Sequence, residues 1–411
     1  MDCDAAASEK IDNKPETSNK SMSRYLYILG LTVMFIYGSY SGVIGLESSI
    51  NIEGGLGTTS VMIVFIVSSF SSIFLLPIII DFLGPKFAII LGELGFVAYI
   101  ASNFYPSWYT LIPAAVVHGI TESGMWAGGS CYVTFLAKKQ WKKETRRNED
   151  SGRSQEALIY QYLGIYYTML FCGDITGGLY LRLQRGRFGE IPSKICPLIF
   201  ICLQAIFLPK ASVKDDQTKD GKLSYSVYDL PILYYNYTAF ILRTFIFYNG
   251  LYYAYVITEY TRAFVSCSIG VEKLGLATGV LGAFTIFGTL IGGRVLYRLG
   301  RTKYAIVVVC WHLGTFLCSN FWQPHPNNTW VIYLLGAFLG IGQGVINNML
   351  EGLTAHYFRG TEGIAFSVKN CIMNLGIVAG TAWSTSLCVY VKIYILIGII
   401  LFSVVCFFIA E

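Results

Sequence analysis

The sequence predicts an all-α integral membrane protein, in which about twelve transmembrane helices form two related halves of six helices each. The prediction rests on the composition, on a series of long apolar segments and on an internal repeat. Hydrophobic residues make up 54% of the 411 residues and charged residues only 13%, where soluble domains have roughly 25% charged residues. A soluble fold could not bury this much apolar surface, whereas a surface that faces lipid requires it.

A helix needs roughly 20 mainly apolar residues to cross a bilayer. Segments of this kind lie at 25–46, 58–80, 87–105, 109–136, 157–181, 195–208, 233–257, 275–297, 304–322, 330–352, 363–388 and 391–410. The sixth is the weakest, because it is short and lies between Pro192 and Pro209. We therefore expect a tail at 1–24, an N-terminal half at 25–208, a linker at 209–230 and a C-terminal half at 231–411.

Basic residues in the short loops predict the orientation of the helices in the membrane. Lysine and arginine are concentrated in 137–155, and they also follow the second and eighth spans. These loops share the cytoplasmic side if both termini are cytoplasmic, as the positive-inside rule requires. The basic loop 182–194 contradicts this orientation, because it would lie on the extracellular side of the membrane. The glycosylation acceptor Asn327 would also lie on that side, which agrees with the orientation. The sequence favours a multi-pass protein of the plasma membrane or an endomembrane.

Two parts of the chain repeat each other in the same order. Residues 83–89 resemble 299–306, and 103–105 match 320–322. Gly38 and Glu47 match Gly250 and Glu259, respectively, at one shared offset. Two six-helix halves in parallel repeat are the plan of the major facilitator fold.

The short loops after the second and eighth spans fit this plan. The first has Asp81, Gly84 and Lys86, which resemble a reduced gating-loop motif, and the second has Arg298 and Gly300 but no acidic residue. Glycine permits the tight turn, and the charged side chains can hold neighbouring helix ends together.

Four segments carry a more specific resemblance, namely 45–58, 103–113, 248–251 and 387–396. The most distinctive is Asn-Phe-Tyr-Pro-Ser-Trp-Tyr-Thr-Leu-Ile-Pro at 103–113. Together they resemble the Unc-93-like family, a branch of the major facilitator superfamily. The chain departs from the family at Glu47, where glutamine is usual. The resemblance implies regulation of a potassium channel or escort of another membrane protein, and no settled substrate.

Polar residues inside the spans are the candidate functional residues, because a charge at the centre of a bilayer costs about 2.5–3.5 kcal/mol. In a facilitator, spans one, four, seven and ten line a central cavity. These spans carry Glu47, His118, Glu122, Arg243, Glu259, Gln343, Asn347 and Glu351. Glu122 is the candidate proton- or cation-sensitive carboxylate, and Arg243 is its expected counter-charge.

The alternative for each of these residues is a hydrogen bond that only holds helices together. For Glu47, Glu259 and Glu351, which lie near span ends, we favour this structural role. A histidine such as His118 is more often a satisfied core residue than a switch. Lys369, on a flanking span, is expected to have a pairing role.

Neither an enzyme nor a nucleic-acid-binding protein is expected. The sequence has no nucleophile elbow, metal-binding helix or phosphate loop, and the net charge of +5 is assigned to the loops. The 11 cysteines contain no CxxC pair that would indicate zinc. No cofactor is expected. Two hypotheses remain, namely a regulator of a channel or other membrane protein, and a secondary transporter of an unknown solute or ion.

Overall fold

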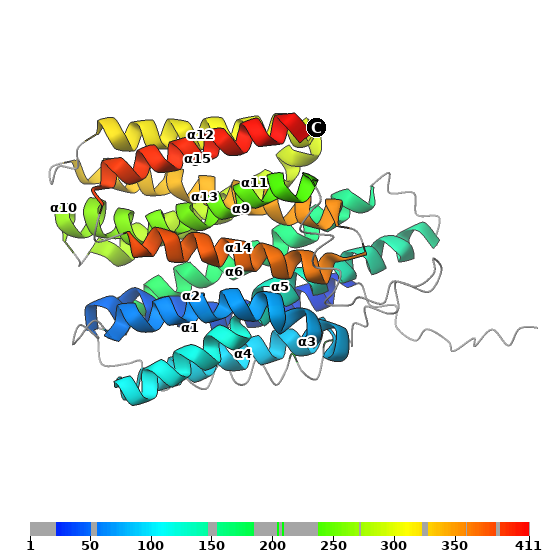
Figure 1. The fold of residues 1–411 in the computed structure, drawn as a ribbon, viewed down its shortest axis with the longest axis horizontal. Helices are drawn as coiled ribbons and strands as arrows, with labels where there is room; N and C mark the ends of the chain where they lie inside the picture. The colour runs from blue at the N-terminus through cyan, green and yellow to red at the C-terminus, as the bar shows by residue number, and fades with distance from the viewer. Residues whose placement is uncertain are drawn as a thin grey trace, which may run out of the picture.

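The computed structural model describes residues 22–50, 56–146, 154–184, 204, 208, 237–270, 273–322, 328–358, 360–383 and 387–410, and every regular element in these ranges is a helix (Figure 1). The elements are α1 (Met22–Ile50), α2 (Leu56–Phe74), α3 (Leu76–Leu83), α4 (Pro85–Ser102), α5 (Trp108–Arg146), α6 (Gln155–Gln184), α9 (Tyr237–Tyr255), the π-helix η4 (Val256–Ser266), α10 (Cys267–Ile269), α11 (Leu274–Leu299), α12 (Arg301–Phe321), α13 (Thr329–Tyr357), α14 (Glu362–Ala382) and α15 (Val389–Ala410). The predicted sixth span lies outside this description apart from Gln204 and Leu208.

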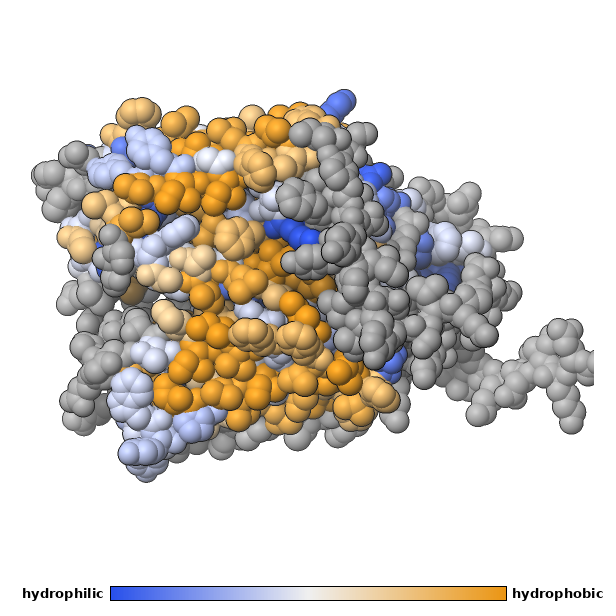
Figure 2. All heavy atoms as spheres, in the orientation of Figure 1, coloured by the Kyte–Doolittle hydropathy of each residue, from blue (hydrophilic) through white to orange (hydrophobic). Residues whose placement is uncertain are grey.

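Several of these helices can cross a membrane. In the described ranges, α4, α11, α12, α13, α14 and α15 are long and apolar enough to do so, and the bent pair α2 and α3 is a seventh candidate. Figure 2 shows a broad hydrophobic band over the face of the molecule. Large apolar side chains such as Phe70, Phe82 and Phe402 point outward. The chain is therefore a multi-pass integral membrane protein.

Three helices differ in shape from the predicted spans. The second span is broken at Leu75, where the axes of its two parts differ by 51°. Pro77 explains the break, since proline lacks the amide hydrogen and clashes with the preceding turn. The fourth span continues to Arg146, and the seventh changes from an α-helix to a π-helix at Val256.

The turns at Gly84 and Gly300 have the same conformation. Their φ angles are 83° and 76°, which favour glycine because other residues would be strained there. Each amide donates to a carbonyl four residues earlier at 3.0 Å, from Gly84 to Ile80 and from Gly300 to Leu296. The glycines thus end one helix and begin the next within a single residue.

Buried side chains form two large hydrophobic clusters. One comes mainly from residues 26–208 and the other mainly from 242–407. Within the first region α1 packs on α6 and α5 on α4, and within the second α11 packs on α13 and α9 on α14. The regions meet where α6 packs on α11 and α2 on α14.

Candidate functional site

A buried ion pair joins Glu351 on α13 to Lys369 on α14. Glu351 is 2% exposed, and its Oε1 also accepts a hydrogen bond from the hydroxyl of Tyr167 on α6. Tyr167 in turn lies 2.8 Å from Ser130 Oγ on α5. Side chains of α6 and α14 therefore meet at the Glu351 carboxylate of α13, and α5 joins the network through Tyr167, which extends the pairing role expected of Lys369.

A second polar contact ties α14 to α2. Asn370 Nδ2 donates to Ser72 Oγ, and Asn374 Nδ2 donates to Ser68 Oγ, both at 2.9 Å. Residues four apart share one face of a helix, so the two bonds lie one turn apart. Both bonds lie among fully or almost fully buried side chains. They replace the hydrogen bonds that buried polar groups cannot obtain from lipid.

Glu122 on α5 lies beside this contact. Trp126 Nε1 donates to Glu122 Oε1 at 3.1 Å, and the Ser68 side chain lies near the carboxylate. The indole of Trp126 packs edge-on against Tyr37 of α1, at 5.5 Å between ring centroids. Within the described ranges there is no ion pair between Glu122 and Arg243, although Arg243 lies half-buried on α9.

His118, one turn before Glu122, has aromatic surroundings. Its ring lies 4.2 Å from the centroid of Phe96, 5.1 Å from Tyr40 and 5.3 Å from Tyr99. Neither ring nitrogen has a hydrogen-bond partner in the described residues. The two residues share a side of α5 by spacing, but the structure gives them different neighbours.

Three amides connect α9 and α13 near the middle of both helices. Gln343 Nε2 donates to Asn249 Oδ1 at 3.3 Å, and Asn249 Nδ2 donates to Asn347 Oδ1 at 2.7 Å. Gln343 and Asn347 thus share one network, as their spacing on the tenth span suggests. Glu351 lies one turn after Asn347 on the same helix but bonds to other helices.

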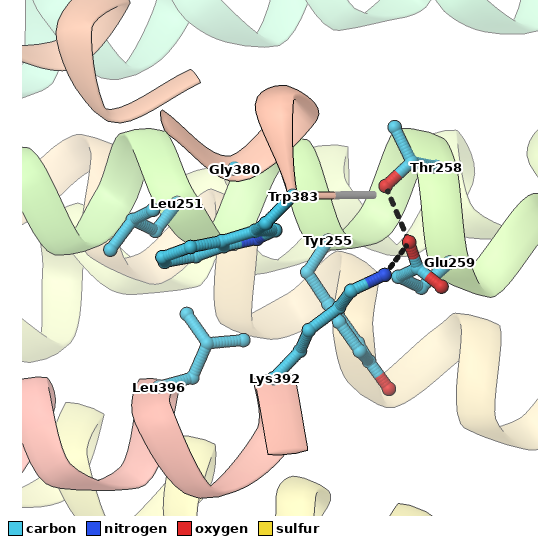
Figure 3. A pocket seen from close by; sticks show the side chains of 8 residues that line it. All are labelled: Leu251, Tyr255, Thr258, Glu259, Gly380, Trp383, Lys392 and Leu396. Carbon is cyan, nitrogen blue, oxygen red and sulfur yellow. Dashed lines mark hydrogen bonds and ion pairs between the residues drawn. The ribbon is translucent and has the colours of Figure 1, made fainter. Parts of the chain in front are cut away.

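Glu259, in the π-helix, pairs with Lys392 of α15 at 2.6 Å. Figure 3 shows this pair at one end of a small pocket that Trp383 helps to line, with Thr258 also bonded to the carboxylate. The cavity volume is about 10 Å³, which is room for a single water molecule. π-helices often occur at functional sites, and this one carries the buried Glu259–Lys392 pair.

Replacing Lys392 with methionine should lower the free energy of unfolding by about 3 kcal/mol, because breaking one side of a buried pair leaves the other charge poorly compensated. Denaturant unfolding in mixed micelles measures the change. Glu259→Gln combined with Lys392→Met should recover most of the lost free energy of unfolding. Arg262→Gln is the control, since Arg262 lies 3.4 Å from Glu259 but is 52% exposed. An equal loss of unfolding free energy in Arg262→Gln would contradict the special importance of the buried Glu259–Lys392 pair.

The remaining predicted residues are dispersed. Asp81 and Arg298 are exposed and form no ion pair in the described part of the chain. Lys86 is almost buried and donates to the carbonyl of Leu208 at 2.6 Å. Glu47 lies on α1 with its side chain outside the description, and Asn327 is itself outside it.

Comparison with known proteins identifies the family. The family model described as "Ion channel regulatory protein UNC-93" matches residues 48–319. The chain belongs to the UNC-93 family. The resemblance found in the sequence is therefore confirmed.

Other UNC-93 proteins match most of the chain at low identity. "Protein unc-93 homolog A" of Homo sapiens is 24% identical over 434 aligned residues, which cover 94% of this chain and 93% of that protein. "UNC93-like protein 3" of Arabidopsis thaliana is 25% identical, with coverages of 87% and 80%. "Putative potassium channel regulatory protein unc-93" of Caenorhabditis elegans is 24% identical, with coverages of 90% and 58%.

Sequence reasoning missed several polar partners in this UNC-93 chain. Lys392 was overlooked because it stands at the edge of a long apolar span, where a lysine can reach water. Ser68 and Ser72 had a usable signal, since their spacing of four matches that of Asn370 and Asn374. Tyr167 had no such signal, because tyrosine is common throughout this chain.

Proposed function

We propose that this UNC-93 protein is a non-enzymatic regulator of another membrane protein, with a potassium channel as the first candidate. The supporting observation is the family match over residues 48–319, whose description names ion channel regulation and no reaction. The Caenorhabditis elegans relative is named as a putative potassium channel regulator. A partner that spans the same membrane fits the apolar exterior.

The proposed body has twelve spans in two six-helix halves, at 25–208 and 231–411, joined by a linker at 209–230. Both termini are cytoplasmic in this proposal. The paired glycine turns at Gly84 and Gly300 and the separation of the hydrophobic core into two clusters support it. Protease accessibility of tags at the termini and of the 137–155 loop in sealed vesicles tests the orientation, and an outward-facing tag at either terminus would exclude it.

Capture of the intact protein with its partners tests the regulatory function. The tagged protein is purified in a mild detergent from cells that express it at native levels, and co-purifying membrane proteins are identified. We expect a channel whose current changes when this chain is co-expressed with it. Failure to recover any membrane protein, or recovery of a channel whose current is unaffected, would contradict the regulatory proposal.

A secondary transporter is the second candidate function. It is supported by ion pairs that join helices of different regions: Lys138 on α5 pairs with Glu362 on α14 at 2.5 Å, and His356 on α13 with Glu156 on α6 at 3.2 Å. Breaking such pairs would let the two regions move apart. In this proposal Glu122 and Arg243 face the central cavity.

A flux assay in liposomes distinguishes a transporter from a regulator. A transporter should move labelled ions or solutes, and linking Lys138→Cys to Glu362→Cys with a short bifunctional maleimide should stop the flux. Each single variant treated with the same reagent is the control. Absence of flux from the wild-type protein would exclude transport while leaving regulation in place.

A further inference from the structure

Four glutamates are buried inside the described helices, and they differ in their cationic neighbours. Glu259 pairs with Lys392, and Glu351 pairs with Lys369. Glu93 and Glu122 have no basic side chain within ion-pair distance in the described part of the chain. An uncompensated carboxylate away from water is too costly to persist. A cation or a proton must therefore neutralise each of these two groups.

Glu122 and Glu93 differ in their surroundings. Glu93 lies near the amide of Gln204, and neither side chain has a hydrogen-bond partner in the described residues. Glu122 lies beside a hydroxyl, that of Ser68, in a helix where Ser68, Ser69, Ser71 and Ser72 are all buried. Hydroxyl and carboxylate oxygens are the ligands that hard cations prefer. The amide of Gln204 can donate a hydrogen bond to Glu93, whereas Glu122 lies beside a hydroxyl oxygen, so Glu122 is the stronger candidate for a cation site.

Two oxygens at this place still lack a donor. Glu122 Oε2 and Ser123 Oγ are buried and find no hydrogen-bond partner in the described residues. The direction of Ser123 follows from Gly119, four residues earlier on α5, where an added Cβ would lie 2.7 Å from the carbonyl oxygen of Val64 on α2. Ser123 shares that face of α5. It therefore points toward α2, the helix that carries Ser68.

We propose that Glu122, Ser68 and Ser123 form a binding site for one monovalent metal cation at the junction of α2 and α5. A single positive charge neutralises the carboxylate, and both unpartnered oxygens act as ligands of the ion. A proton would also remove the charge of Glu122, and the carboxyl O–H could donate to Ser123, so the experiment has to distinguish protonation from ion binding. A divalent ion would leave a net positive charge, because the site has one carboxylate where Ca²⁺ sites usually have several.

The site also connects α5 to α14. Ser68 accepts a hydrogen bond from Asn374 while it lies beside Glu122, so one hydroxyl contacts both the proposed ion-binding carboxylate and the α2–α14 contact. Lys369 of α14 pairs with Glu351. Ion binding would thus tighten the packing of α2, α5 and α14. The inference uses Glu122, which is also a transport candidate, and holds for a regulator or a transporter.

Thermal unfolding of the purified full-length protein tests the proposal. Sodium, potassium or lithium chloride replaces N-methyl-D-glucamine chloride at constant ionic strength and pH, and binding of ²²Na⁺ is measured in parallel. We expect at least one of these ions to raise the melting temperature by a saturable few degrees, because a ligand of the folded state stabilises it by mass action. Glu122→Gln should abolish the shift, since the neutral amide needs no counter-ion.

Glu93→Gln is the matched control and should keep the full ion dependence. If Glu122→Gln does not fold, Ser123→Ala serves instead and should raise the half-saturating ion concentration several-fold. A melting temperature that responds to pH but to none of the three cations would show that Glu122 binds only a proton, and would overturn the proposal. All readouts use the isolated protein, so failure to capture a partner would not affect them.

Discussion

Replacing Lys369 with methionine should reduce the free energy of unfolding by about 3–5 kcal/mol, which is the usual loss when one partner of a buried ion pair is removed. Lys369 is the only basic side chain that pairs with Glu351 in the described residues, and Glu351 is 2% exposed. The variant would leave a carboxylate that is held by the hydroxyl of Tyr167 alone. Denaturant titration in mixed micelles, followed by tryptophan fluorescence, measures the loss.

Two further variants separate the charge from the packing at this position. Glu351→Gln combined with Lys369→Met removes both charges and should restore most of the stability, because well-packed neutral replacements of a buried pair are often tolerated. Tyr167→Phe removes one hydrogen bond and should cost about 1 kcal/mol. A double variant as unstable as Lys369→Met would show that shape, not charge, dominates at this site.

The helical membrane fold could be predicted because its signals are local. Long apolar segments follow from the thickness of the bilayer, and most helix ends fall within a few residues of the predicted spans. The break at Leu75 also had a local cause in Pro77. The π-helix at Val256 is harder to foresee, since its apolar and polar residues are equally compatible with an α-helix.

The partners within the candidate site could be predicted only in part. His118 and Glu122 lie four residues apart on one helix, yet their neighbours come from different helices. Spacing also placed Glu351 near a span end, whereas the structure buries it against α6 and α14. Contacts between helices depend on their rotation about their axes, and one sequence does not determine that rotation. The polar residues of α13, Gln343, Asn347 and Glu351, could be recognised in the sequence, but their hydrogen-bond partners could not.

The glycine repeat illustrates how a weak sequence signal gains a physical cause. Gly38 matches Gly250, and both lie at close helix crossings. A Cβ on Gly38 would lie 2.9 Å from the carbonyl oxygen of Gly173, so α1 approaches α6 closely there. A Cβ on Gly376 would lie 3.0 Å from the Cα of Gly250, so α9 approaches α14 in the same way. The glycines at these crossings therefore allow α1 and α6, and likewise α9 and α14, to pack backbone against backbone.

Gly250→Val should consequently be among the most damaging single substitutions in the chain. The valine side chain would have to fit between the backbones of α9 and α14, with its Cβ 3.0 Å from the Cα of Gly376. Overpacking usually costs about 1–3 kcal/mol when side chains can give way. Because backbone cannot, we expect a loss at or above the top of that range, measured as the free energy of unfolding in mixed micelles.

Gly279→Val on α11 provides the matched control, since an added Cβ there meets nothing within 4 Å. Its effect should stay within about 0.5 kcal/mol, as for other substitutions away from packed contacts. The neighbouring Asn249 gives a second readout, because separating α9 from its neighbours would also break its 2.7 Å bond to Asn347. Asn249→Ala in the Gly250→Val background should then add little further loss, whereas in the wild-type protein it should cost about 1 kcal/mol. Full additivity of the two substitutions would mean that α9 keeps its place and that the glycine contact is less restrictive than the backbone distance indicates.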